Sequence, residues 1–125
     1  PIIPHPERNR EIRENPDLLY SLVEAGAISQ VTAGSLTGYY GSEVEKFSIK
    51  LFKCNLSHLV ASDGHGIKNR RPVIQDAYEE LSKRIGQDFV KSILSNTLNI
   101  LNGKELQLSV PSKISRNKLL RIFNK

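Results

Sequence analysis

The alternation of short apolar strands with amphipathic helices is the feature that most constrains the fold of this chain. Strands are predicted at residues 2–3, 27–33 and 59–61, and helices at 15–26, 42–54, 72–85 and 87–102. Because strands separated by helices pair in parallel through right-handed crossovers, this order predicts an α/β fold. Three strands make a small parallel sheet, so we expect the array to be the carboxy-terminal part of a (β/α) barrel.

Local signals set the expected boundaries of these elements. Asn15-Pro16-Asp17 is typical of a helix start, with an asparagine cap and a proline at the first helical position. Ser42 and Glu45 match a capping box, which predicts the start of the next helix. Residues 34–38 contain two glycines and predict a flexible loop. The opening Pro1-Ile2-Ile3 is typical of the inside of a buried strand.

The start and composition of the chain bear on where it works. Methionine is absent and the sequence begins within a predicted strand, so we expect a natural start to be missing. No apolar run approaches the roughly 20 residues of a transmembrane helix, and no secretory leader is present, which favours the cytoplasm. The lone Cys54 cannot form an internal disulfide and is expected to be a small buried hydrophobe.

The formal charge of +5 is concentrated at one end of the chain. Residues 1–103 hold 12 Lys/Arg and 12 Asp/Glu, whereas residues 104–125 hold six Lys/Arg and one Glu. We therefore expect a neutral domain over 1–103, a basic flexible tail over 104–125, and no nucleic-acid partner. The tail is either a solvated terminus or, through its cations and the apolar patch around Leu119 and Phe123, a contact with an anionic membrane surface.

Residues typical of a metal site follow two of the predicted strands. His5 lies just after the first strand, and Asp63 and His65 follow the third. The carboxyl ends of parallel strands meet at one edge of the sheet, so these distant residues can converge. Residues two apart in extended backbone point the same way, so Asp63 and His65 can face one group of ions. Such ligands suit zinc, manganese or iron. The alternative is that both side chains only make loop hydrogen bonds.

Arginines accompany each proposed ligand. Arg8 lies three residues after His5, and Arg70 and Arg71 lie on the loop after His65. Guanidinium groups match phosphate oxygens, so this placement suggests a site for a phosphate ester. The alternative is that these arginines are exposed and pair with nearby carboxylates such as Glu7.

Other phosphatase and hydrolase chemistries do not fit the sequence. The C-x5-R phosphate loop is absent, because Val60 stands where that arginine would be, and no phosphate-binding P-loop is present. His58 precedes the core of its strand, at the end away from the proposed site, and is expected to be structural. A metal-activated water is the remaining route to phosphate ester hydrolysis.

Three segments together resemble a known family. His5-Pro6-Glu7-Arg8, the strand and turn Gln30-Val31-Thr32-Ala33-Gly34-Ser35-Leu36, and Ala61-Ser62-Asp63-Gly64-His65 followed by Arg70 are similar to the PHP-type (polymerase and histidinol phosphatase) metal-dependent bacterial protein-tyrosine phosphatases of capsule and exopolysaccharide clusters. The similarity extends to about residue 103. It implies a PHP-type (β/α) barrel, and a phosphotyrosine-protein phosphatase acting on the tyrosine kinase that regulates capsule synthesis.

The resemblance also implies a ligand set. His5, Asp63 and His65 would be three ligands of a trinuclear site, commonly manganese, and Arg8 and Arg70 would grip the phosphate. Arg71 does not match the family's phosphate arginine. The family's opening H-x-H ligands and two glutamates have no counterpart here, so we expect the chain alone to be inactive.

Two other classes of function stay open. A related enzyme of the same superfamily would act on a small phosphate ester, and substrate profiling would separate it from a protein phosphatase. A basic-tailed, non-enzymatic binding module would show no metal and salt-dependent binding.

Overall fold

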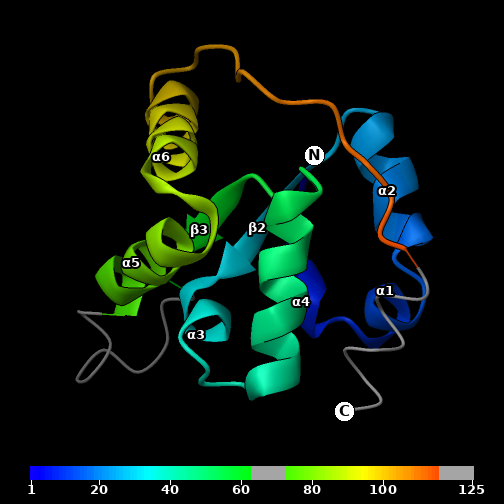
Figure 1. The fold of residues 1–125 in the computed structure, drawn as a ribbon. Helices are drawn as coiled ribbons and strands as arrows, with labels where there is room; N and C mark the ends of the chain where they lie inside the picture. Colours follow the sequence, from blue (N-terminus) through cyan, green and yellow to red (C-terminus); the bar gives the residue numbers. More distant parts are fainter. Residues whose placement is uncertain (63–72, 116–125) are drawn as a thin grey trace.

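Three parallel strands form the sheet of this α/β fold (Figure 1). The computed structural model describes residues 1–62 and 73–115. Strands β1 (Ile2–Pro4), β2 (Ile28–Thr32) and β3 (Leu59–Ala61) lie side by side in the order β1-β2-β3. Both pairings are parallel, with Pro4 opposite Gln30 and Thr32 opposite Ala61. The predicted parallel pairing of strands separated by helices is therefore confirmed.

Strand β1 is more open than its sequence suggested. Ile2 is 48% exposed, although it was expected inside a buried strand. In the described part of the chain β1 pairs only with β2, so its outer edge has no neighbouring strand. The expectation of a buried strand was therefore wrong for these residues.

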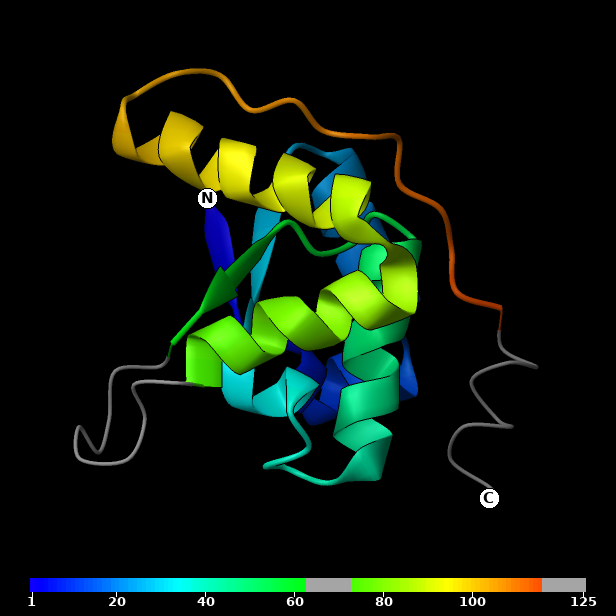
Figure 2. The same cartoon turned by 60° about the vertical axis from the view of Figure 1, so that its left-hand side comes forward.

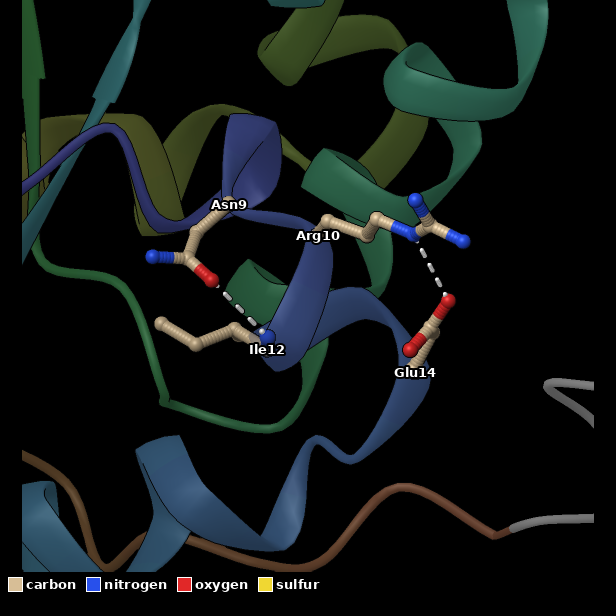
Figure 3. A network of polar contacts seen from close by, with 4 residues as sticks. All are labelled: Asn9, Arg10, Ile12 and Glu14. Carbon is tan, nitrogen blue, oxygen red and sulfur yellow. Dashed lines mark hydrogen bonds and ion pairs between the residues drawn. The ribbon is translucent and has the colours of Figure 1, made fainter.

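Three short elements connect β1 to β2: η1 (Pro6–Arg8), α1 (Arg10–Glu14) and α2 (Asp17–Glu24). The side chain of Asn9 caps α1 by accepting a hydrogen bond of 3.1 Å from the backbone N–H of Ile12, and Arg10 and Glu14 pair on the exposed face (Figure 3). The proposed cap of α2 was wrong in detail. Pro16 takes the cap position, and the side-chain oxygen of Asn15 accepts no hydrogen bond.

Helices α3 (Ala33–Leu36) and α4 (Ser42–Lys53) connect β2 to β3. A flexible loop was expected at residues 34–38, but residues 33–36 form a helical turn that is buried throughout, because it packs against α4 and α5. The predicted capping box of α4 was also wrong. Gly41, with φ 101°, is the cap residue, so Ser42 already lies inside the helix and its side chain does not cap it.

Helices α5 (Val73–Ile85) and α6 (Gln87–Leu101) follow β3 close to the predicted ranges, and they lie against each other (Figure 2). Their apolar faces join the strands and α4 in one core. Its largest fully buried side chains are Phe47, Phe52, Leu19, Leu36, Leu51, Leu56 and Leu81. None of the helices in residues 1–62 and 73–115 is long and apolar enough to cross a membrane.

Residues 104–115 run from the end of α6 across the molecule toward α2 (Figures 1 and 2). Asn96 exchanges two hydrogen bonds with the backbone of Gln107, at 2.9 and 3.0 Å. The backbone N–H of Ser112 donates to the carbonyl of Cys54, and Ile114 is buried in the core. This part of the basic segment is therefore attached to the body of the protein, while Leu119 and Phe123 lie outside the described residues.

Candidate functional site

His5 lies where β1 ends, at the carboxyl edge of the sheet. Its backbone N–H donates to the carbonyl of Gln30 at 2.9 Å, which continues the pairing with β2 by one residue. His5 then adopts a left-handed conformation, with φ 35° and ψ 57°, and its side chain is exposed. Such a conformation is uncommon outside glycine and is often found at functional sites. It turns the chain sharply from the strand into η1.

Arg8 is the last residue of the same turn, and its guanidinium group lies beside an aromatic ring. It is exposed at the end of η1, and its guanidinium carbon is 4.3 Å from the centre of the Tyr40 ring. This distance is typical of a cation–π contact. The segment from His5 to Arg8 therefore presents an imidazole and a guanidinium group from one short turn.

Glu7, between these two residues, is the site residue that the sequence did not reveal. Its side chain is fully buried, and its Oε2 accepts hydrogen bonds from the backbone N–H of Thr32 at 2.9 Å and from the Ser35 hydroxyl at 2.6 Å. Burial raises the pKa of the Glu7 carboxyl, and the bonds from Ser35 and Thr32 oppose that shift. Among the described residues the Glu7 carboxylate faces α3 and pairs with no arginine, so the alternative in which it pairs with Arg8 was wrong.

The contacts of Glu7 join two segments of the candidate site. They attach the turn from His5 to Arg8 to the point where β2 passes into α3. The other carboxylate oxygen, Oε1, is buried and has no hydrogen-bond partner. Burying a polar group without a hydrogen-bond partner costs free energy, so the position of this carboxylate lowers the stability of the fold. In the sequence, the only hint was the hydroxyl of Ser35, because the other donor is the backbone N–H of Thr32.

The remaining predicted site residues follow β3. Asp63, His65, Arg70 and Arg71 lie outside the described residues, so their positions stay predictions. Strand β3 ends at Ala61, opposite Thr32 of β2, and Ser62 is exposed. The chain therefore leaves β3 at the carboxyl edge of the sheet, the same edge at which it leaves β1 through His5.

Of the proposed metal ligands, His5 lies within the described residues. Across residues 1–62 and 73–115, no three His, Cys, Asp or Glu side chains are grouped so that they could hold an ion. The exposed imidazole of His5, one residue beyond the end of a strand, suits a single ligand of zinc, iron or manganese. A complete ligand set needs donors from other segments.

His58 serves the core, as expected. It is buried, and its Nδ1 accepts a hydrogen bond of 3.0 Å from the backbone N–H of Ser29. The Ser29 hydroxyl also donates to the carbonyl of Leu56 at 2.6 Å. Burial lowers the pKa of His58, which favours the neutral imidazole that can accept this bond. The prediction of a structural role is confirmed.

Comparison with known proteins identifies the family of this chain. Residues 1–102 match the family described as "Capsular polysaccharide synthesis, CpsB/CapC". The match covers most of the sequence, and the chain belongs to this family.

The relatives are tyrosine phosphatases. The chain is 45% identical over 123 residues to the tyrosine-protein phosphatase YwqE of Bacillus subtilis, covering 98% of this chain and 48% of the relative. It is 36% identical over 118 residues to the putative tyrosine-protein phosphatase CapC of Staphylococcus aureus, covering 94% of this chain and 46% of that protein. The chain thus spans about half the length of the curated relatives it matches.

A solved structure supports the same relationship. The fold superposes with a TM-score of 0.88 and 45% identity on a crystal structure from work on YwqE of B. subtilis and CpsB of Streptococcus pneumoniae, described there as metal-dependent tyrosine phosphatases. The superposition covers 93% of this chain and 47% of the other. The α/β fold with its small parallel sheet is therefore that of half of such a protein.

Proposed function

We propose that this chain is the carboxy-terminal part of a metal-dependent protein-tyrosine phosphatase that acts on the tyrosine kinase regulating capsule and exopolysaccharide synthesis. The observation that carries the proposal is the shared edge of the sheet. In a chain belonging to the capsule family, the turn from His5 to Arg8 and the exit of β3 toward Asp63 lie at the same carboxyl edge. This is the edge at which parallel α/β enzymes place their reactive residues.

The proposed ligands are His5, Asp63 and His65. Imidazole and carboxylate donors suit manganese, the metal we propose, as well as iron or zinc, and three ions would be held in the complete protein. When bound, such ions lower the pKa of a coordinated water and stabilise charge on phosphate oxygens. The chain supplies His5 on a turn that is fixed by its backbone bond to Gln30.

The proposed phosphate-binding residues are Arg8 and Arg70. A guanidinium group presents several N–H donors in one plane, which can bind two phosphate oxygens at once. Arg8 is exposed at the sheet edge and can therefore meet a substrate there. As the bond to the tyrosine oxygen breaks, such donors stabilise the charge on the phosphoryl oxygens.

The same proposal covers the fold around the site, the role of residues 104–125 and the location of the protein. Residues 1–103 would form the carboxy-terminal portion of a PHP-type (β/α) barrel, whose remaining strands would adjoin the open edge of β1. Residues 104–125 would be a basic extension able to contact an anionic membrane surface near the kinase. The protein would work in the cytoplasm.

Activity of the complete protein tests the proposal. With manganese present, Asp63→Ala should lower hydrolysis of a phosphotyrosine peptide by more than about 100-fold, because loss of groups that only support a ligand already costs about 10- to 100-fold. Asp76→Ala, at an exposed position on α5, is the matched control and should keep the wild-type rate. Wild-type hydrolysis by Asp63→Ala would remove that residue from the site.

The chain alone provides a second test. Residues 1–125 contain the three proposed ligands but not the H-x-H and the two glutamates that the resemblance implies, so this chain should turn over little p-nitrophenyl phosphate with manganese. Equal rates for the chain and the complete protein would refute the proposal that the remaining ligands lie elsewhere.

A further inference from the structure

Two adjacent tyrosines follow α3, and the second of them, Tyr40, lies beside Arg8. The Tyr40 ring stands 4.3 Å from the Arg8 guanidinium carbon. Tyr39 meets Tyr40 edge to face, with ring centres 4.9 Å apart and planes at 82°. Tyr39 is 68% exposed, whereas Tyr40 is half-buried. Tyr40 is therefore the ring that joins Arg8 to the body of the protein.

The Tyr40 ring packs directly on the backbone of α3. A Cβ added to Gly34 would lie 3.2 Å from Cε2 of Tyr40 and 3.4 Å from Cβ of Tyr39. The backbone N–H of Tyr39 also donates to the carbonyl of Gly34 at 2.9 Å. Gly34 thus provides the space that the ring occupies, and α3 fixes where the ring stands.

The same short helix also fixes the backbone that carries Arg8. Ser35 of α3 donates to the carboxylate of Glu7, the residue directly before Arg8. Arg8 is therefore connected to α3 twice: its backbone through Glu7 and its guanidinium group through Tyr40. A long arginine side chain otherwise samples many rotamers, and holding it in one of them lowers the cost of binding a ligand.

We propose that Tyr40 is a positioning residue that holds the guanidinium group of Arg8 ready for the phosphate of the substrate. This rests on the proposed function, in which Arg8 binds that phosphate. The electron-rich face of the ring attracts the cation and orients its plane without using the N–H donors, which lie in that plane and are the groups that bind phosphate oxygens. A Cβ at position 34 would press on the ring at 3.2 Å, so the ring would have to shift by a few tenths of an ångström.

Steady-state kinetics of the complete, manganese-loaded protein test this role. Tyr40→Leu should lower kcat/KM for p-nitrophenyl phosphate by about 3- to 30-fold and weaken inhibition by inorganic phosphate to a similar extent. Tyr40→Phe keeps the ring and should stay within about 2-fold of wild type. Wild-type kinetics for Tyr40→Leu, or an equal loss in Tyr40→Phe, would overturn the proposal.

Tyr20→Leu is the matched control. It removes a ring that also lies near a cation, 5.3 Å from Nζ of Lys113, but on α2, which Figure 1 places well apart from α3. This variant should keep wild-type kinetics. If Tyr40→Leu does not fold, pentafluorophenylalanine at position 40 keeps the shape of the ring while reversing its attraction for a cation, and it should show the same loss.

A double-mutant cycle separates this proposal from the proposed function. Arg8→Ala should lose activity, and adding Tyr40→Leu to it should cause no further loss, because the ring then has nothing to position. If Arg8→Ala loses activity but Tyr40→Leu does not, the positioning role is wrong and the proposed function stands. If Arg8→Ala keeps wild-type activity, the role of Arg8 fails, and the role of Tyr40 fails with it.

Discussion

Replacing the buried Glu7 should show how strongly the turn from His5 to Arg8 depends on α3. Two substitutions, each with a side chain similar in size to glutamate, separate the effect of losing the charge from the effect of losing the hydrogen-bond acceptor. Glu7→Gln keeps an oxygen that can accept the bonds from Thr32 and Ser35 but removes the charge. Glu7→Leu fills the same space but leaves both donors without an acceptor.

The structure sets the size of the expected effects. Both donors are buried, and leaving a buried donor unsatisfied costs about 1 to 3 kcal/mol, so Glu7→Leu should lower the free energy of unfolding by about 2 to 6 kcal/mol. Burial raises the pKa of the Glu7 carboxyl, which means that the ionised form is disfavoured inside the protein. Glu7→Gln removes that cost and should therefore stay within about 1 kcal/mol of wild type.

Urea unfolding at constant pH measures both variants. The midpoints should shift while the dependence on urea stays constant, which indicates a change in stability alone. Glu11→Leu, at an exposed position on α1, is the control and should change stability by less than about 0.5 kcal/mol. The reasoning is refuted if Glu7→Leu is as stable as wild type, or if Glu7→Gln loses as much as Glu7→Leu.

Two further predictions concern stability. Burial lowers the pKa of His58 from its ordinary value of 6.5, so the unfolded chain gains a proton before the folded one, and stability should fall as the pH drops below 6.5. His58→Asn, which keeps an acceptor for the Ser29 N–H, should lack this contribution. Urea unfolding at several pH values should show wild type losing its advantage over the variant by at most about 1.4 kcal/mol per pH unit, and parallel curves would contradict this. Asn9→Ala removes the acceptor for the N–H of Ile12 and should lower the unfolding free energy by about 1 kcal/mol, whereas an unchanged urea midpoint would exclude a capping role.

The sequence predicted those elements whose signals are local. Strand β3 was expected at residues 59–61 and is found there, and α6 was expected at 87–102 and ends one residue earlier. Helix α3 was missed for a physical reason. A four-residue turn containing glycine and serine has no intrinsic helical stability, and it forms here because α4, α5 and Glu7 surround it.

The residues of the candidate site also fall into two groups: those that could be placed from the sequence and those that could not. His5 and Arg8 could be placed at the edge of the sheet from their positions after a predicted strand. Glu7 and Tyr40 could not be recognised, because their partners lie 25 to 32 residues away in the sequence and only the folded chain brings them together. A buried glutamate looks like any surface glutamate when it is read in a sequence. The positions of Asp63, His65 and Arg70 stay predictions.

Helix α3 connects the turn from His5 to Arg8 with the end of β2, which are the two segments of the site that the structure describes. A single helical turn would not persist alone, so its order depends on the groups packed around it. Two of those groups, Glu7 and Tyr40, are also the ones that hold the backbone and the guanidinium group of Arg8. Loosening α3 would therefore release Arg8 at both points together. The placement of the arginine that would bind phosphate therefore depends on the packing of α3, and through it a buried turn would influence an exposed site.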